Sequence, residues 1–522
     1  MRIGVDVGGT NTDAVLMDGR RVLAEHKTPT TPDVTTGIVA ALEGLRRTAG
    51  FRIEEVGGVM IGTTHFTNAV VERRRLAPTA AIRLGLPATA ALPPMVDWPD
   101  DLRAALGGHV YLCRGGFEFD GRRIAPLDED EVRRVADRIG ALGIRSVAIS
   151  SVFSPVNAEM EVRAAEIVAE ALPGVAISLS HEIGRVGLLE RENATILNAS
   201  LRELAGRITD ALEAAVRGLG IEAPLYISQN DGTLMSVDYC RQYPVATFTS
   251  GPTNSMRGAA FLSGEAECVV VDVGGTTTDV GALVHGFPRE ASLAVHVGGV
   301  RTNFRMPDVL SVGLGGGSLV RGGGPELEIG PQSVGYQITE RALVFGGDTL
   351  TATDLAVAAG LVEIGDAERV RGLDQALVEA GMGLIQSRLA DLVDRVKTSA
   401  EPLPVVVVGG GSVLVRDDLP GASRVVKPDH FAVANAIGAA IAQVGGETDR
   451  IFSLADLPRE RALEVAQREA VDRAIAAGAE PGSVQVVEVE EVPLAYLPSN
   501  AVRIRVKAVG DLRLGVVDAA RA

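Results

Sequence analysis

Cysteine is scarce in this sequence, which has three of them, Cys113, Cys240 and Cys268, among 522 residues. None of the three has the CxxC spacing, so neither a disulfide framework nor a cysteine zinc site is expected. Aromatic residues are also few, at 4% of the chain, whereas glycine occurs 61 times. A chain of this composition depends on small residues and tight turns rather than on bulky aromatic packing.

An excess of positive charge is absent as well, because the formal net charge is −17. Nucleic-acid surfaces need clustered Lys and Arg, so no nucleic-acid partner is expected. The longest apolar runs, such as "PVVVVGGG" at 404–411, are far too short to span a bilayer. The opening "MRIGVDVGG" has the pattern of a strand entering a turn and lacks that of a signal peptide. We therefore expect a soluble, cytoplasmic protein with no membrane partner.

The order of the predicted elements indicates an α/β fold in which one plan occurs twice. Residues 2–29 predict three short strands, followed by a helix over 33–47. Residues 268–299 again predict three strands, followed later by a helix at 351–362, a buried strand at 404–414 and a helix at 430–444. A long helix is expected from about 190 to 219, and a helix with two strands after about 448. These patterns predict domains at 1–189 and 190–447, with a small C-terminal α/β unit at 448–522.

One peptide is present in both halves: "VDVGGTNTD" at 5–13 returns as "VDVGGTTTD" at 271–279. Each copy is expected at the turn between the first two strands. Asp6 and Asp272, at the ends of buried strands, supply carboxylates that can hold Mg²⁺. The glycines let the backbone approach a phosphate, to which N–H groups and Thr hydroxyls can donate. The candidate phosphate-binding residues are Gly8, Gly9, Thr10, Asn11, Gly274, Gly275, Thr276 and Thr277.

A simpler interpretation of each copy is a tight hairpin whose glycines need a positive φ. Asp13 and Asp279 can likewise cap their own hairpins instead of binding metal. Two other nucleotide motifs do not fit. No GxxxxGK[ST] is present, and the glycine pairs lie between strands rather than before a helix.

The duplicated strand–DxGGT–strand resembles the phosphate loops of the actin, Hsp70 and sugar kinase superfamily. That resemblance implies two ribonuclease H-like domains around a cleft that binds ATP and Mg²⁺, with Asp6 and Asp272 as catalytic and metal-binding residues. In that superfamily a Gly-rich turn after a late strand holds the adenosine. "VVVVGGGSVL" at 405–414 is similar, which assigns this role to Gly409, Gly410, Gly411 and Ser412. The alternative is that this triplet is only a turn.

Further motifs narrow the resemblance, and they follow one another in the order "IGTTHFTNAVVERR", "SLSHEIGRVGLLERENATILNASL", "SQNDGTLMS", "TSGPTNSMRGA" and "SVGLGGGSL". With both hairpins, they resemble the hydantoinase/5-oxoprolinase family, specifically its N-methylhydantoinase A-type subunit, over roughly residues 1 to 445. The resemblance implies ATP-dependent opening of a cyclic amide or imide, such as a hydantoin or 5-oxoproline. Phosphorylation of the ring carbonyl oxygen would make it a leaving group and let water attack. It also implies a B-type partner subunit and a homo- or hetero-oligomer.

The segment at 334–354 departs from the family pattern because it contains no cysteine. A short, divergent form of the family is therefore expected, and the sequence does not identify which ring compound is its substrate. Two rival functions remain at this point. One is a small-molecule kinase that uses the same cleft, and the other is an ATP-driven switch or reactivating chaperone.

His65 is the remaining catalytic candidate, since it lies between a predicted strand and a predicted helix. It can serve as a general acid or base near neutral pH, or it can simply start the helix. Glu190, Arg191 and Glu192 are expected to form a solvated run of charges. Asn198, on an apolar helix, is expected to satisfy a neighbouring backbone group, and the alternative is that it lines the cleft.

Overall fold

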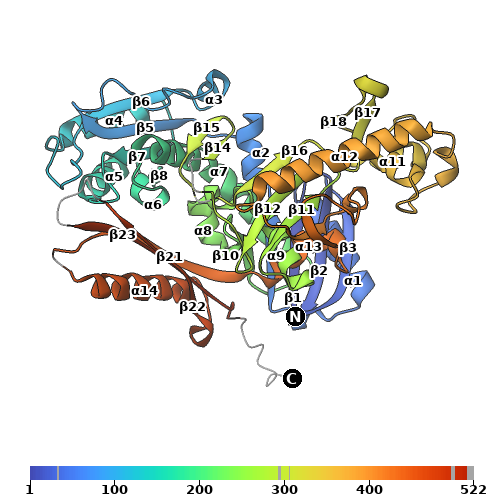
Figure 1. Cartoon of the computed structure of the whole chain (residues 1–522). Helices are drawn as coiled ribbons and strands as arrows, with labels where there is room; N and C mark the ends of the chain where they lie inside the picture. The colour runs from blue at the N-terminus through green and yellow to red at the C-terminus, as the bar shows by residue number, and fades with distance from the viewer. Residues whose placement is uncertain (32–33, 292–294, 305, 456, 495–499, 514–522) are drawn as a thin grey trace.

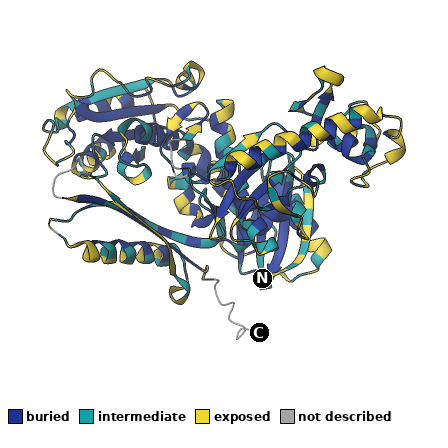
Figure 2. Ribbon diagram, in the orientation of Figure 1, coloured by how far each residue is buried: buried dark blue, intermediate teal, exposed yellow. Residues whose placement is uncertain are grey.

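The computed structural model describes residues 1–31, 34–291, 295–304, 306–455, 457–494 and 500–513. Three main β-sheets and their covering helices make up the molecule, as Figure 1 shows. The strands at the centre of each sheet are buried, and the most exposed residues lie on helices and turns at the periphery (Figure 2).

The first sheet has nine strands, in the order β22-β23-β21-β10-β9-β4-β1-β2-β3. In that order the strands span Gln485–Pro493, Ala501–Gly510, Gln443–Ser453, Thr233–Ser236, Leu225–Ser228, Gly58–Thr63, Arg2–Val7, Asn11–Asp18 and Arg21–Pro29. β1 is antiparallel to β2 and parallel to β4, which in turn is parallel to β9. The predicted strands at the N-terminus are therefore confirmed.

The second sheet is built around β11, whose neighbours are β12 on one side and β19 on the other. Its strands are β11 (Cys268–Val273), β12 (Thr278–Val284), β13 (Phe287–Pro288), β16 (Val309–Val312), β19 (Leu403–Val408) and β20 (Ala422–Val426). β11, β19 and β20 are parallel to one another, and β12 is antiparallel to β11.

Both sheets share one strand order. In the first sheet, β1 lies between its antiparallel partner β2 and the parallel β4, with β9 beyond β4. In the second sheet, β11 lies between its antiparallel partner β12 and the parallel β19, with β20 beyond β19. This is the ribonuclease H-like arrangement expected from the sequence, so the predicted fold class is confirmed.

A third sheet, inserted after β4, contains only parallel strands. It has the order β6 (His109–Arg114), β5 (Thr79–Leu86), β7 (Ser146–Ser151) and β8 (Ala176–Leu179). Strand–helix alternation of this kind puts helices between successive parallel strands. Two small hairpins complete the described strands: β14 (Val295–Val297) with β15 (Val300–Thr302), and β17 (Ser318–Arg321) with β18 (Glu328–Ser333).

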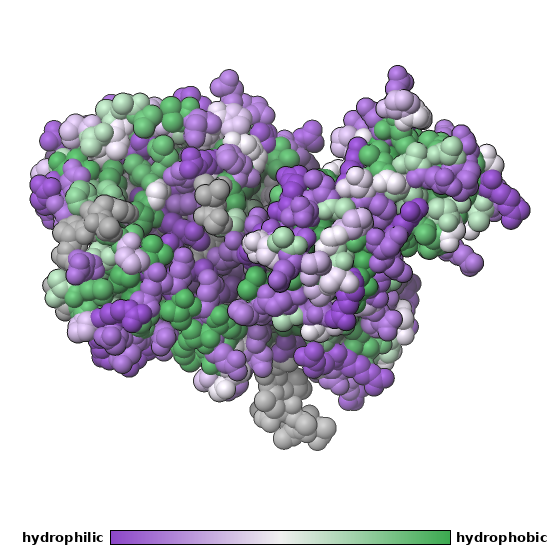
Figure 3. Space-filling model, viewed as in Figure 1, coloured by the Kyte–Doolittle hydropathy of each residue, from purple (hydrophilic) through white to green (hydrophobic). Residues whose placement is uncertain are grey.

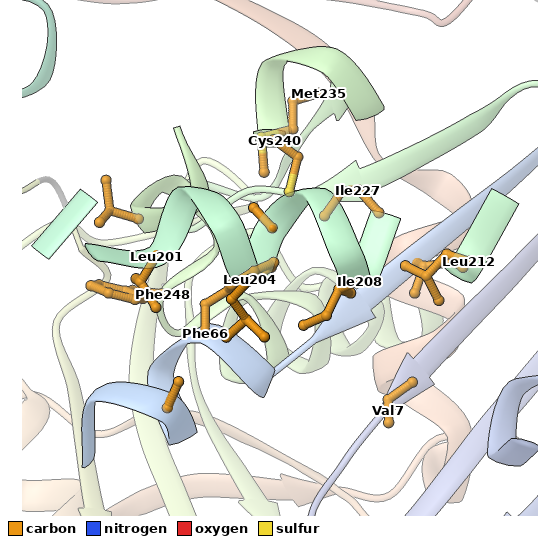
Figure 4. Packing of buried hydrophobic residues seen from close by; sticks show 14 of the residues in the cluster. Val7, Phe66, Leu201, Leu204, Ile208, Leu212, Ile227, Met235, Cys240 and Phe248 are labelled. Atoms are coloured by element: carbon orange, nitrogen blue, oxygen red, sulfur yellow. The ribbon is translucent and has the colours of Figure 1, made fainter. Parts of the chain in front are cut away.

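The described α-helices are α1 (Val34–Ala49), α2 (His65–Glu72), α3 (Asp100–Ala105), α4 (Glu129–Ala141), α5 (Glu159–Ala171), α6 (Ser180–Ile183), α7 (Leu188–Gly218), α8 (Val237–Gln242), α9 (Ser250–Ser263), α10 (Ile338–Arg341), α11 (Ala352–Ala358), α12 (Gln375–Val396), α13 (Ala434–Ile441) and α14 (Arg459–Ala476). The helices predicted at 33–47, 190–219, 351–362, 430–444 and after 448 are present as α1, α7, α11, α13 and α14, whereas others, such as α12, were not predicted. Figure 4 shows Leu201, Leu204 and Ile208 of α7 beside Phe66 of α2, within the largest hydrophobic cluster.

α9 and α13 pack against each other, and glycines allow a very close approach. A Cβ at Gly258 would overlap the Ala434 carbonyl, and a Cβ at Gly438 would overlap that of Asn254. α13 also lies against β1, where a Cβ at Gly4 would overlap the Ala436 carbonyl. These two helices therefore hold a fixed position beside the first hairpin.

The C-terminal residues do form a helix and strands, and those strands extend the first sheet. β21 pairs with both β10 and β23, and β10 itself comes from the range predicted as the second domain. The first sheet thus contains strands from all three predicted domains. The domain boundaries at 189/190 and 447/448 remain predictions. The end of the strand predicted over 483–497 lies outside the described residues.

One predicted strand was wrong. Residues 287–299 were expected to form a single third strand in the second half, but of the described residues in that range only the two of β13 pair with β12, and 295–297 form β14 of a separate hairpin. β16, from later in the chain, takes the rest of that edge of β12. Proline at 288 explains the early end, because proline cannot donate to a sheet. Residues 292–294 lie outside the described range.

Polar side chains cover much of the face shown in Figure 3, with hydrophobic ones scattered among them. Across the part of the chain that the structure describes, no helix combines the length and apolar character needed to cross a bilayer.

Candidate functional site

The first repeated peptide forms the turn between β1 and β2. The Gly8 N–H donates to the Asn11 carbonyl at 3.0 Å, which closes the turn. Thr30 braces it from outside, since its Oγ1 donates to the Gly8 carbonyl at 2.8 Å and its N–H to the Thr10 carbonyl at 3.0 Å. Neither Gly8 nor Gly9 has a positive φ. A positive φ therefore does not explain why glycine occupies these two positions.

The second copy repeats this local geometry. The Gly274 N–H donates to the Thr277 carbonyl at 2.8 Å, as Gly8 does to Asn11. Here a glycine loop supplies the brace: Gly316 N–H donates to the Gly274 carbonyl at 3.0 Å and Gly317 N–H to the Gly275 carbonyl at 2.8 Å. That loop belongs to the "SVGLGGGSL" motif, so the glycine-rich stretch at 312–324 serves the hairpin directly.

The two hairpins face each other. A Cβ built at Gly275 would lie 3.2 Å from the Thr10 hydroxyl oxygen, which is tight for two such atoms. Among the described residues, no internal hydrogen bond uses the N–H of Gly9 or of Gly275. The turns thus meet with backbone donors at their tips, which is the arrangement that binds phosphate oxygens in other anion sites.

The Gly-rich turn after β19 packs directly on the second hairpin. The Gly411 N–H donates to the Val273 carbonyl at 2.7 Å, and a Cβ at Gly409 would overlap the Asp272 carboxylate. Gly409 has a φ of +86°, which an L side chain rarely adopts, so glycine is required there. The three elements predicted from the sequence are therefore next to one another.

A cavity of about 690 Å³ opens beside this turn. Its lining combines apolar and charged side chains: Leu361, Ser412, Val413, Val415, Arg416, Asp417, Asp418, Lys427 and Phe431. Its volume is in the range of small-molecule sites. Of the four predicted adenosine-turn residues, Ser412 lines it.

Side chains from the two central helices contact the repeated aspartates. Asn435 of α13 donates from Nδ2 to Asp6 Oδ2 and to Asp13 Oδ2, both at 3.0 Å. Asn254 of α9 has its Nδ2 3.5 Å from Asp6 Oδ1. The next residue, Ser255, stabilises the charged form of Asp272 through its hydroxyl. α9 therefore touches the carboxylates of both hairpins.

The site concentrates negative charge: Asp6 and Asp13 are buried, and Asp272 and Asp279 are partly exposed. Burial, with Asp13 close by and Asp272 also contributing, raises the pKa of Asp6 to about 7. Burial likewise raises the pKa of Asp272, and it raises the pKa of Asp279 to about 6. Among the described residues, only Lys27 forms an ion pair with one of the four aspartates, at 2.9 Å from Asp13. Buried carboxylate oxygens with so little compensating charge fit a hard divalent cation such as Mg²⁺.

Asp13 and Asp279 do not form local caps of their hairpins. Asp13 contacts Lys27, its cross-strand partner on β3, and the distant Asn435, and Asp279 accepts a hydrogen bond from Ser311 on β16. The local Asx alternative is thus not what the structure shows.

His65 is the first residue of α2 and lies at the same edge of the first sheet as the hairpin. Its Nδ1 is 2.6 Å from the Thr63 hydroxyl, and the Thr64 hydroxyl donates to the Val7 carbonyl at 3.3 Å. The structure therefore places His65 next to the end of β1. A catalytic part for it remains a prediction.

The run of charges at 190–192 was predicted wrongly. Arg191 and Glu192 are fully or almost fully buried rather than solvated. Glu192 pairs with Arg83 and accepts from the Ser150 hydroxyl at 2.5 Å, and Arg191 donates to the Ser151 carbonyl at 2.6 Å. These partners lie on β5 and β7 of the third sheet. Because they are far from 190 in the sequence, the residues around 190 did not indicate the pairing. Asn198 is buried and donates to Ser178 and to the Gln242 carbonyl, a structural part as expected.

Sequence reasoning missed the side chains that contact the aspartates, namely Lys27, Asn254, Ser255 and Asn435. Asn435 carried a signal, because it is a polar residue among small and apolar ones in the helix predicted at 430–444. Asn254 lies in the motif "TSGPTNSMRGA", for which no helix was predicted. Lys27 gave none, since a strand with alternating exposure commonly carries a lysine.

Two ribonuclease H-like sheets with facing hairpins define an actin-like ATPase fold. Residues 2–172 match the family description "Hydantoinase/oxoprolinase N-terminal region", and residues 191–369 match "Hydantoinase/oxoprolinase". Together the two matches span well over half of the chain. The chain belongs to the hydantoinase/oxoprolinase family.

Among curated proteins, the chain is 27% identical to the caprolactamase subunit alpha of Pseudomonas jessenii, over 84% of this chain and 65% of that protein. It is 28% identical to the acetophenone carboxylase gamma subunit of Aromatoleum aromaticum, over 69% of this chain and 53% of that protein. The chain therefore spans about half to two thirds of the length of these relatives.

Two solved structures share the fold over nearly the whole chain. The ATP-dependent caprolactamase from Pseudomonas jessenii superposes with a TM-score of 0.77 at 20% identity, covering 98% of this chain and 88% of the other. The nucleotide-free acetone carboxylase gives a TM-score of 0.69 at 19% identity, with the same coverage. At these identities the likeness establishes the fold alone.

Proposed function

We propose that this chain binds MgATP between its two hairpins and uses the γ-phosphoryl group to activate the carbonyl oxygen of a cyclic amide or imide. The observation that supports this most is the contact between Thr10 and Gly275, which brings two matched phosphate-type turns face to face. The glycine turn and its cavity beside Ser412 give an adenosine a place adjacent to the second hairpin.

In this proposal the N–H groups and hydroxyls of both turns bind the polyphosphate. Asp6 and Asp272 would hold the Mg²⁺, whose chemistry is to neutralise charge on the transferring phosphoryl group. Family membership and the ATP-dependent caprolactamase fold support ATP as the phosphoryl donor.

The proposed chemistry answers the low reactivity of an amide carbonyl. The carbonyl oxygen attacks the γ-phosphorus, the bond to the β-phosphate oxygen breaks, and ADP leaves. Water then adds to the activated carbon, and the ring C–N bond breaks as nitrogen takes a proton. The acyl phosphate that remains reacts with a second water to give a carboxylate and phosphate. His65 is the candidate proton carrier at the hairpin edge.

The relatives favour a second acceptor class, because two of them are carboxylase subunits that act on acetophenone and acetone by name. A ketone oxygen could accept the phosphoryl group in the same position. The relatives are also named as subunits, which supports action with a second, B-type subunit. The chain would then form part of a hetero-oligomer.

One panel of reactions tests the proposal. The chain, alone and with its candidate partner subunit, is incubated with MgATP and cyclic imides, lactams, ketones with bicarbonate, or alcohols. Phosphate release and product mass are then followed. Imide- or lactam-stimulated phosphate release with a ring-opened product supports the proposal. A carboxylated ketone would instead support a carboxylase, a phosphorylated alcohol a kinase, and turnover changed only by a protein partner an ATP-driven switch. Each of these results would contradict the proposal.

Asp6→Ala and Asp272→Ala test the carboxylates directly. Each substitution removes a proposed metal ligand and should lower MgATP-dependent phosphate release by more than about 100-fold, because outer-shell changes alone cost 10- to 100-fold. Circular dichroism should show an intact fold. Full activity in both variants would refute the metal-binding part.

A further inference from the structure

Asn435 joins two buried carboxylates that come from different strands of the first hairpin. Its Nδ2 lies 3.0 Å from Asp6 Oδ2 and 3.0 Å from Asp13 Oδ2. A primary amide carries two N–H donors, so each carboxylate can receive one. Asp6 and Asp13 are also directly opposite each other in the β1–β2 pair, and the amide links their carboxylates.

The orientation of this amide is determined by its surroundings. Its Oδ1 accepts from the Ala436 N–H at 2.9 Å, which assigns the oxygen to that side and the nitrogen to the carboxylates. α13 cannot shift easily, because Gly4, Gly258 and Gly438 bring its neighbours into backbone contact. A rigid helix thus presents the donor at a fixed position.

The segment just before Asn435 contacts the glycine turn beside the cavity. The Gly409 N–H donates to the Phe431 carbonyl at 2.9 Å. Lys27 Nζ donates to the Ala432 carbonyl at 3.0 Å and pairs with Asp13 at 2.9 Å. Residues 431–435 therefore connect the turn next to the second hairpin with both carboxylates of the first.

We propose that Asn435 is a positioning residue that orients the Asp6 carboxylate toward the metal ion of a bound Mg–nucleotide. This inference rests on the proposed nucleotide site, and Asn435 acts only through Asp6 and Asp13, without touching substrate. Asn254 contacts Asp6 from the other side at 3.5 Å, so it restrains the same carboxylate more weakly.

The test uses Asn435→Ala and Asn435→Ser, with Ile437→Val as the matched control. Serine suits a helix start and has one hydroxyl, which cannot reach both carboxylates. Ile437 is fully buried on the same helix but belongs to a hydrophobic cluster, so its variant perturbs α13 packing without changing the amide. Thermal melts confirm which variants fold.

Mn²⁺ binding is measured by electron paramagnetic resonance in the presence of a non-hydrolysable ATP analogue, and metal-free analogue binding by calorimetry. Both Asn435 variants should bind Mn²⁺ at least about 10-fold more weakly, while metal-free analogue binding and the Ile437→Val protein stay within about threefold of wild type. Mn²⁺ affinity within twofold of wild type in a folded Asn435 variant would overturn the inference.

The same measurements separate this inference from the proposed function. Mn²⁺ binding that depends on Asn435, without any imide or lactam turnover, would support the positioning part and contradict the hydrolase. A wild-type chain that binds neither would overturn both.

Discussion

Two clusters of polar side chains lie in this molecule, one buried and one partly exposed, and they differ in how their charge is balanced. Around α7, Glu192 faces the Arg83 guanidinium and the Ser150 hydroxyl, and every part of this group has a partner within the protein. Around the hairpins, Asp6, Asp13, Asp272 and Asp279 gather with Lys27 as their ion-pair partner. The first cluster satisfies itself, whereas the second is left with negative charge that a bound cation would neutralise.

This difference separates structure from function more clearly than residue type does. Both clusters contain charged residues inside recognisable motifs. Only the hairpin cluster combines a raised carboxylate pKa with facing turns and a neighbouring cavity. Uncompensated burial of that kind is costly for a fold and is common at functional sites.

The largest expected effect is on the balanced cluster. Glu192→Gln leaves the buried Arg83 guanidinium without its counter-charge and should lower the free energy of unfolding by about 3–5 kcal/mol. Urea denaturation measures this. Glu464→Gln, in the exposed Arg461–Glu464 pair of α14, is the control and should leave stability unchanged within error. A loss below about 1 kcal/mol for Glu192→Gln would show that the Arg83–Glu192 pair stabilises the fold no more than an exposed pair does, and would contradict the distinction between the two clusters.

The hairpin cluster should respond in the opposite direction. A carboxyl whose pKa rises from 3.8 to about 7 on folding makes the fold lose stability as pH increases between those values. Asp6→Asn removes that charge, so without divalent metal it should be more stable than wild type at pH 8, by up to about 4 kcal/mol. At pH 4 the two should be nearly equal. A variant less stable than wild type at pH 8 would show that the charge is already compensated.

Metal binding should have the smallest effect on stability, and it should act through the hairpin cluster only. Millimolar Mg²⁺ with ATP should raise the melting temperature of wild type at pH 8, since a ligand at 100 times its Kd adds about 2.7 kcal/mol. The shift should shrink in Asp6→Asn and persist in any folded fraction of Glu192→Gln. Equal shifts in wild type and Asp6→Asn would show that the cation binds elsewhere.

Much of this contrast could be predicted from the sequence, because the hairpin site depends on local peptides. "VDVGGTNTD", its second copy and "VVVVGGGSVL" each specify a strand and a turn, and repeated strand order brings them together. The α7 cluster depends instead on a third sheet whose Arg83 and Ser150 lie far from Glu192 in sequence. No local pattern at 190–192 distinguishes a buried pair from a solvated run.

The same limit applies within the site. Asn435 reaches the aspartates through the packing of α13, which only the three-dimensional structure specifies, whereas Lys27 lies opposite Asp13 within the β2–β3 hairpin. The strand predicted at 287–299 was wrong for a related reason, since β16 takes its place from a later part of the chain. Local turns were predictable, and partners brought together by long-range packing were not.

The central claim is that the two hairpins bind one triphosphate from opposite sides, and a crystal structure with Mg²⁺ and a non-hydrolysable ATP analogue tests it most directly. The account predicts phosphate oxygens bound by the N–H groups and hydroxyls of both hairpins, a metal ion held by Asp6 and Asp272, and the base beside Ser412. A nucleotide bound away from both hairpins, or in contact with one of them only, would contradict it.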